Sequence, residues 1–183
     1  MTLTIIIIVA VLVILIMWGI GVQNKLVKSD EFCKNSLKQI NVQQISRFDA
    51  IKSLVKLARE YAQVEADNLS KVIASRQMTA SANPTASEVN GNEAFLTQVS
   101  SKLFALAEQY PDLKANTNYN QAMSSIKEYE ENVRLSRMTF NDSVTRYNNQ
   151  VRMFPASLIA SMLGFSQREY LEEDKTRTAF PEI

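Results

Sequence analysis

The sequence predicts an all-α protein, in which an N-terminal transmembrane helix is followed by an antiparallel helical bundle of three long helices plus a short C-terminal helix. Three observations lead to this fold class. The chain begins with a long uncharged apolar run, glycine and proline number only four each, and apolar residues recur at helical spacing in the rest of the chain. A sheet protein with many tight turns would need more glycine and proline.

The apolar run Leu3–Val22 carries no charge and is dominated by isoleucine, leucine and valine. As a helix it would be about 30 Å long, which matches the hydrocarbon core of a bilayer. Trp18 lies near its C-terminal end, where an amphipathic ring suits the interface. We interpret the run as an uncleaved anchor, because no Lys or Arg precedes it and residues 19–23 make a poor signal-peptide cleavage site.

Positive charge follows the anchor and does not precede it. Lys25 and Lys28 come first, and Lys34 and Lys38 follow them. The positive-inside rule therefore predicts a single-pass protein with its N-terminus outside and its bundle in the cytoplasm. The candidate membrane-interface residues are Trp18, Lys25 and Lys28. The predicted domain plan is a short tail (1–2), the transmembrane helix (3–22), a juxtamembrane connection (23–29), the helical bundle (30–165) and a C-terminal tail (166–183).

The first half of the bundle is divided by one predicted loop. No Gly or Pro interrupts residues 30–78, which predicts one very long helix or two nearly continuous ones. Residues 81–92 include Pro84 and Gly91 and are expected to form a loop. A second helix is predicted over residues 93–109.

The second half is divided at its prolines. The segment Tyr110–Leu113 stops the second helix, since the residue before a proline avoids the α region. A third helix is predicted over residues 118–153. Pro155 then begins a short apolar helix over 156–163, which Gly164 ends, and the tail 166–183 is expected to fray.

The composition excludes several classes of catalytic and metal site. The chain has no histidine, so it contains no Ser-His-Asp triad, no HExxH zinc motif and no Glu-x-x-His di-iron pair. Cys33 is the only cysteine, which excludes an intrachain disulfide and a cysteine zinc cluster. Lys and Arg total 20 and Asp and Glu total 19, so net charge does not favour nucleic acid. We therefore expect no catalytic residue, metal or cofactor.

The third helix carries a seam in which charged residues occupy positions that should face the core. Its members are spaced alternately four and three residues apart: Ile126, Glu130, Val133, Arg137, Phe140, Val144, Tyr147 and Val151. In the first helical region Arg47, Glu65 and Arg76 fall on or beside the apolar stripe. Arg47, Glu65, Arg76, Glu130 and Arg137 are thus a candidate buried polar network. Its charges either snorkel to the bundle edge, or form interhelical ion pairs that determine register, or line a polar ligand site.

The turn after the second helix is a second candidate site, formed by Tyr110, Pro111, Asp112, Lys114 and Asn116. Pro111 would set the bend, Asp112 would cap the following turn, and Leu113 would plug the bundle end. Lys114 and Asn116 would hydrogen-bond exposed helix ends. The alternative is a surface that docks a partner. The apolar helix after Phe154 is likewise either a lid on the core or a membrane-surface contact.

Several blocks of the sequence resemble the LemA family. They are Tyr110–Asn116, the later stretch with Arg137, Phe140-Asn141, Val144, Tyr147-Asn148, Phe154-Pro155, Leu158–Ala160 and Gly164-Phe165, and upstream Asn41–Gln43, Arg47–Asp49, Tyr61-Ala62 and Arg76. The resemblance covers roughly residues 25 to 172 and the anchor. The chain departs from the family pattern at Lys52, where a proline is common, and at Leu171, where a phenylalanine is common. The first helix should therefore lack the usual proline kink.

The resemblance implies a single-pass protein of the bacterial inner membrane with an antiparallel bundle and no settled enzymatic activity. Genes of the family often neighbour that of a membrane metalloprotease, and a related branch takes part in building magnetosome membranes. We expect a non-catalytic scaffold or adaptor in envelope or membrane-protein homeostasis. Its partners would be the lipid bilayer and an unidentified membrane or cytoplasmic protein, with that metalloprotease as one candidate. The alternative is a ligand-binding sensor or hydrolase that uses Glu65, Glu130 and Arg137.

Overall fold

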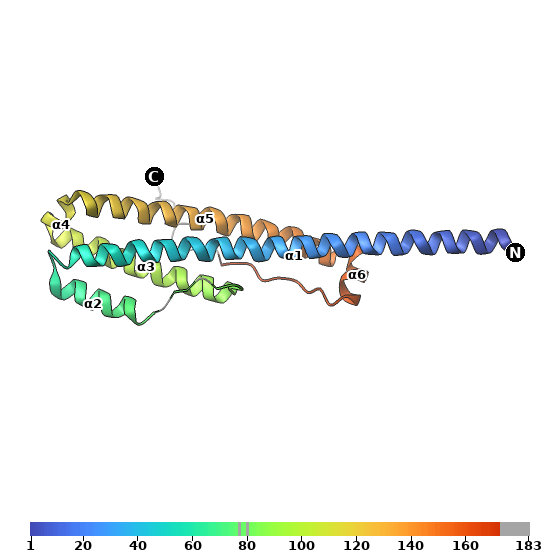
Figure 1. Ribbon diagram of the computed structural model, residues 1–183, viewed down its shortest axis with the longest axis horizontal. Helices are drawn as coiled ribbons and strands as arrows, with labels where there is room; N and C mark the ends of the chain where they lie inside the picture. The colour runs from blue at the N-terminus through green and yellow to red at the C-terminus, as the bar shows by residue number, and fades with distance from the viewer. Residues whose placement is uncertain (77, 80, 173–183) are drawn as a thin grey trace, which may run out of the picture. The chain divides into compact units, whose positions relative to one another are not determined.

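The computed structural model describes residues 1–76, 78–79 and 81–172, and this part of the chain contains six helices and no strand (Figure 1). The all-α fold class is thereby confirmed. The helices are α1 (Thr2–Ala58), α2 (Gln63–Ala74), α3 (Ala86–Gln109), α4 (Pro111–Ala115), α5 (Thr117–Arg152) and α6 (Ala156–Met162). The chain forms two compact units: the first comprises Met1–Asn35 and Phe140–Tyr170, and the second comprises Ser36–Thr139 with residues 171 and 172.

Helix α1 contains both the apolar run and the polar residues that follow it. The expected anchor and the connection 23–29 are successive parts of this one helix, which also passes Lys52 without a break. All side chains of residues 3–17 are exposed. Within the described residues, α1 is the one helix long and apolar enough to cross a membrane. A helix that is apolar on every face is stable in lipid and not in water, so we describe the chain as a membrane protein.

Residues 30–78 do not form one long helix, and the two helices found there are not nearly continuous, because the chain reverses between them. Helix α1 ends at Ala58, and α2 runs back antiparallel to it (Figure 1). The Tyr61 and Ala62 amides both donate to the Ala58 carbonyl, at 3.1 and 2.9 Å, which closes the turn. Nε of Arg59 donates across the turn to Asp67 at 2.7 Å. No Gly or Pro marks this reversal, which instead buries the apolar stripe of α2.

Helix α3 begins seven residues before its predicted start at Glu93, because Thr85 and Glu88 form a capping box. The Glu88 amide donates to the Thr85 hydroxyl at 3.2 Å, and the Thr85 amide donates to the Glu88 carboxylate at 2.8 Å. The predicted loop over 81–92 is thus wrong in its second half. Gly91 lies inside the helix, and a Cβ there would be 3.3 Å from Nη2 of Arg76.

The second unit is an antiparallel bundle of the later part of α1, α2, α3 and the first part of α5, with α4 at one end (Figure 1). Its α1 and α3 segments run parallel to each other and antiparallel to α2 and α5. The predicted third helix is confirmed as α5, to within one residue at each end. The core of this unit comprises Phe48, Ile51, Leu54, Val55, Ala58, Ala62, Ala66, Leu69, Ile73, Leu96, Val99, Leu103, Leu106, Ala107, Leu113, Tyr119 and Ile126.

The first unit contains the N-terminal part of α1, the end of α5, α6 and the segment up to Tyr170. Helix α6 confirms the predicted short helix and ends one residue early. Gly164 ends it in the left-handed conformation, with φ of 76°, and the Phe165 amide donates to the Ala160 carbonyl at 2.9 Å. The unit also encloses Cys33, whose burial raises the pKa of its thiol.

The start of the C-terminal tail does not fray as predicted. The side chain of Asn148 donates to the Arg168 carbonyl at 3.0 Å and accepts from the Arg168 amide at 2.9 Å. The Tyr147 hydroxyl donates to the Ser166 carbonyl at 2.9 Å. These bonds attach the tail to α5 because α5 presents polar side chains on that face. Residues 173–183 lie outside the described part of the chain.

An ion pair joins the tail to α1 within the first unit. Nε of Arg168 donates to Oδ1 of Asp30 at 2.7 Å, and Lys34 lies 3.0 Å from the other carboxylate oxygen. Partial burial raises the pKa of Asp30, but the hydrogen bonds and charges of Arg168 and Lys34 outweigh it, so the pKa is below its ordinary value of 3.8. The pair therefore stabilises the unit when Asp30 is ionised.

We expect Asp30→Asn to reduce the acid sensitivity of this unit. A carboxyl group whose pKa is lowered by folding stabilises the folded state above its unfolded pKa, and this contribution is lost as pH falls through the folded pKa. The wild-type melting temperature should therefore drop more steeply than that of Asp30→Asn below about pH 4. Circular dichroism of the full chain in detergent micelles measures both profiles. Asp142→Asn, at an exposed aspartate of the same unit, should retain the wild-type profile, and equal slopes for all three proteins would contradict the prediction.

Candidate functional site

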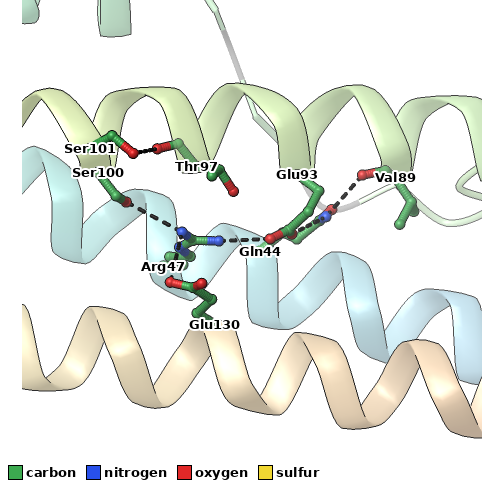
Figure 2. Close-up of polar contacts among 8 residues, drawn as sticks. All are labelled: Gln44, Arg47, Val89, Glu93, Thr97, Ser100, Ser101 and Glu130. Atoms are coloured by element: carbon green, nitrogen blue, oxygen red, sulfur yellow. Dashed lines mark hydrogen bonds and ion pairs between the residues drawn. The ribbon is translucent and has the colours of Figure 1, made fainter. Parts of the chain in front are cut away.

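A polar cluster lies inside the second unit, around the side chain of Arg47 (Figure 2). Gln44 and Arg47 come from α1, one helical turn apart, so both point to the same side of that helix. Glu93 and Ser100 come from α3, and Glu130 comes from α5 (Figure 2). Arg47 and Gln44 are both 0% exposed. A guanidinium in this position must be paired, because an isolated buried charge costs several kcal/mol.

The guanidinium of Arg47 contacts both other long helices of the cluster. Its Nη1 donates to Oε1 of Glu93 at 2.8 Å, and its Nη2 donates to Oε2 of Glu130 at 3.3 Å. The Glu93 side chain is 18% exposed and that of Glu130 is 36% exposed. Glu93 is therefore the closer and less screened counter-charge, whereas water stabilises part of the charge on Glu130. A third contact, from Nη2 to the Ser100 hydroxyl at 3.4 Å, is weak.

Gln44 extends the cluster along α3. Its Nε2 donates to Oε2 of Glu93 at 3.0 Å and to the Val89 carbonyl at 2.9 Å. Both carboxylate oxygens of Glu93 are thus engaged, one by Arg47 and one by Gln44. Among the described residues, Oε1 of Gln44 and Nε of Arg47 have no hydrogen-bond partner. The cluster joins α1, α3 and α5, so its ion pairs depend on the register of these helices.

The chemistry available to this cluster is limited. Both carboxylates accept hydrogen bonds from the same guanidinium, so these oxygens are already engaged within the cluster. No set of three or more Asp, Glu, Cys or His residues that could hold a metal is found in the described ranges. The arrangement is suited to joining helices.

The structure brings together only two residues of the predicted network, Arg47 and Glu130. Glu65 lies on α2 and accepts from the Tyr110 hydroxyl at 3.0 Å. The guanidinium of Arg76 lies 4.9 Å from the centre of the Phe95 ring. For Arg47 and Glu130 the geometry favours the interhelical ion-pair interpretation, because Arg47 does not reach solvent.

Arg137 lies two turns beyond Glu130 on α5 and has its own contacts. Its Nη2 donates to the Asn90 side-chain carbonyl at 3.0 Å and to the Glu172 backbone carbonyl. Its Nη1 is buried without a hydrogen-bond partner among the described residues. Arg137 therefore joins α5 to α3 and to the backbone at Glu172, separately from the Arg47 cluster.

Arg137→Leu is expected to lower the free energy of unfolding by only about 1 kcal/mol. Two hydrogen bonds are lost, but the cost of burying the unpartnered Nη1 disappears with them. Urea unfolding of the full chain in detergent micelles measures the change. Arg134→Leu, at an exposed arginine of the same helix, is the matched control and should leave the midpoint almost unchanged. A loss several times larger than expected would show that Arg137 belongs to an essential network.

Sequence reasoning missed Gln44, Glu93 and Ser100. A signal for the last two was present, because Glu93, Leu96, Ser100 and Leu103 have the same alternating spacing of three and four that marked the seam of α5. Gln44 carried the same signal, because Ile40, Gln44, Arg47 and Ile51 are also spaced alternately four and three residues apart. The pairing itself depends on which helices become neighbours.

The second predicted site, residues 110–116, forms the end of the second unit. Pro111 is the first residue of α4, and Leu113 is fully buried. Asn116 accepts from the Tyr119 amide at 3.1 Å, which caps α5, and donates to the Tyr61 hydroxyl at 2.8 Å.

The two charged residues of this turn do not have the expected cap contacts. Lys114 contacts Glu108 at 2.8 Å instead of a helix end. For Asp112 the described residues show no cap hydrogen bond, and the start of α4 has no side-chain cap. The first turn of α4 therefore depends on the fixed φ of Pro111.

The predicted membrane-interface residues Trp18, Lys25 and Lys28 all lie on α1 with exposed or partly exposed side chains. They belong to the first unit and have no part in the Arg47 cluster.

A groove runs along the surface of the second unit between α2 and α3. Its walls are Glu65, Asn68, Leu69 and Val72 from α2 and Lys102, Ala105, Leu106 and Gln109 from α3. Each wall follows the spacing i, i+3, i+4, i+7, which is one face of a helix over two turns. Glu65 lines this groove, whereas Glu130 and Arg137 do not, so the three residues of the hydrolase alternative do not meet in it.

Comparison with known proteins gives one family and a small group of relatives. The model of the LemA family matches residues 36–183. The chain is 31% identical over 72 residues to magnetosome protein MamQ 2 of Paramagnetospirillum magneticum, and 32% identical over 72 residues to magnetosome protein MamQ of Magnetospirillum gryphiswaldense. Each match covers 39% of this chain and 26% of the relative, so the chain spans about a quarter of the length of these relatives. Because the family match covers most of the sequence, the chain belongs to the LemA family.

Proposed function

We propose that this protein is a non-catalytic, membrane-anchored scaffold or adaptor that binds an amphipathic helix of a partner protein in the groove between α2 and α3. The observation that carries the proposal is the matched spacing of the two walls. Two antiparallel helices that both expose an i, i+3, i+4, i+7 face form a seat for a third helix. Val72 and Ala105 supply exposed apolar contact above the buried Leu69 and Leu106, while Glu65 and Lys102 place opposite charges along the two walls.

The contacts of the Arg47 cluster support a structural role for the other polar residues. Arg47 pairs with both Glu93 and Glu130, and Gln44 donates to the other carboxylate oxygen of Glu93. An enzyme or sensor would need some of these groups directed at a substrate or ligand. We therefore place the function on the surface of the bundle and assign the cluster to its stability.

Photocrosslinking in the native membrane tests the proposed groove. A photoreactive amino acid replaces Ala105 in the groove. In the matched control it replaces Leu135, which is an exposed residue of α5. We expect a discrete adduct with a second protein from position 105, its loss when Val72→Glu is added, and no such adduct from position 135. Equal adducts from both positions, or adducts only with further copies of this chain, would contradict a partner groove. A membrane metalloprotease is the first candidate partner to test, by its association with the family.

We further propose that the chain is a single-pass protein of a bacterial inner membrane, with its N-terminus outside and its bundle in the cytoplasm. The lysines that follow the apolar run support this orientation. The similarity to magnetosome proteins supports a role at a membrane, in envelope or membrane-protein homeostasis, and the short matched segment suggests a shared bundle more than a shared pathway. Alkaline phosphatase fused to the C-terminus should be inactive, and strong activity would reverse the orientation.

A further inference from the structure

The end of α5 and helix α6 expose an unusual amount of apolar surface. Within a short stretch of chain the exposed fractions are 61% for Met153, 80% for Phe154, 56% for Leu158, 81% for Met162 and 47% for Leu163. Scattered apolar residues are common on protein surfaces, but a contiguous group of large ones marks a surface that is covered in the native setting. We therefore expect another molecule to cover the exposed apolar side chains of the corner from Met153 to Leu163.

Helix α6 has a packed face and a free face. Ala160 is fully buried, and Cδ1 of Ile159 lies 3.7 Å from the position of a Cβ on Gly19. A Cβ at Gly19 would be in ordinary van der Waals contact with Ile159, so α6 packs beside α1 at this point. Leu158 and Met162 lie on the other side of α6 and are exposed. The sequence offered two roles for this helix, a lid on the core and a membrane contact. Its buried face fits the first role and its exposed face fits the second.

The contact with Gly19 places α6 beside the apolar run Leu3–Val22, since Gly19 is within its last turn. Up to Met17 the side chains of α1 are exposed, whereas Gly19 and Val22 are partly covered and Leu26 is fully buried. The protein's own packing therefore begins inside the apolar run, and Trp18, one residue before Gly19, is the residue type expected at the interface.

We infer that the corner 153–163 is a bilayer-contact surface whose exposed apolar side chains enter the leaflet around the C-terminal end of the anchor. Since Gly19 is in the membrane-spanning run, the neighbouring α6 lies at the depth of the acyl-chain boundary. The exposed cations Lys25, Lys28 and Arg152 belong to the same unit and suit the anionic headgroups above that boundary. The inference rests on the anchor being inserted.

Quenching of tryptophan fluorescence by brominated lipid tests this inference in the full-length chain. The protein is reconstituted in vesicles of phosphatidylcholine and phosphatidylglycerol whose acyl chains carry bromine near their middle. In a Trp18→Phe background, Leu158→Trp and Phe154→Trp each introduce a single indole at an exposed position of the corner. The matched control is Phe32→Trp, which is also exposed on α1 but lies about 20 Å along the helix from Gly19. Circular dichroism establishes that each variant retains its helices.

The expected result is that bromine reduces the emission of Leu158→Trp and Phe154→Trp at least twofold more than that of Phe32→Trp. Quenching of both corner variants no greater than that of the control would overturn the inference. Emission that resists bromine but shifts with the protein-to-lipid ratio would also overturn it, in favour of a second copy of the chain. Trp18 in the wild-type protein reports the anchor separately: if Trp18 is quenched and the corner is not, the anchor stands and only the contact surface fails.

Discussion

Arg47→Met is expected to lower the free energy of unfolding of the bundle by about 3 kcal/mol. Methionine has a similar length and preserves most of the apolar packing of the arginine stem. What is lost is the pair of charged hydrogen bonds to Glu93 and Glu130, at 2.8 and 3.3 Å. Glu93 is then left as a largely buried carboxylate without its counter-charge. Urea unfolding of the full chain in detergent micelles, followed by circular dichroism, measures the loss.

A second substitution separates the unpaired charge from the loss of packing. Arg47→Met combined with Glu93→Gln removes the stranded charge and retains an oxygen that can accept from Gln44. The double variant should recover about 1 kcal/mol of the loss. Arg134→Met makes the same change at an exposed arginine and should leave the midpoint almost unchanged. If Arg47→Met behaves like this surface control, the cluster does not stabilise the bundle.

Leu113→Ala is expected to lower the free energy of unfolding by about 3 kcal/mol. Leu113 lies on the five-residue helix α4, and its side chain is fully buried in the core of the second unit. So short a helix is not stable alone, and here it is held by Pro111 at its start and by this one core contact. Truncation to alanine removes apolar contact and leaves a cavity that the backbone at a closed bundle end cannot collapse to fill. The same urea experiment measures the loss.

Leu135→Ala is the matched control for Leu113→Ala, because Leu135 is 48% exposed on α5. It should change the free energy of unfolding by no more than about 0.5 kcal/mol. If Leu113→Ala costs no more than Leu135→Ala, residues 110–116 are not a plug for the bundle, and the alternative of a partner-docking turn would gain support.

The parts of the fold that the sequence could predict have strong local periodicity. The apolar run Leu3–Val22 and the seam of α5 are long patterns, and each repeats one rule many times. Pro155 and Gly164 marked the limits of α6 because each restricts or permits a particular backbone conformation. These signals act within one helix, so their interpretation does not depend on what that helix later contacts.

The missed features depend on neighbours. The turn after Ala58 contains no glycine or proline, and the residues on both sides of it are good helix formers. The chain reverses there because Ala66, Leu69 and Ile73 are buried against the core. The early start of α3 could have been predicted, because Thr85 and Glu88 have the spacing of a capping box in the sequence. The glycine and proline of residues 81–92 favour a loop, and this signal outweighed the capping box in the prediction.

By itself the sequence determined that the chain is an all-helical member of its family with one helix apolar enough to cross a membrane, and that charges occupy core-facing positions of its helices. Only the tertiary structure decided which charges meet. Arg47 pairs with Glu93 and Glu130, while Glu65, Arg76 and Arg137 go to other partners. The physical reason is range: helical periodicity acts over a few residues, whereas a buried ion pair depends on the register of helices whose residues are far apart in the chain.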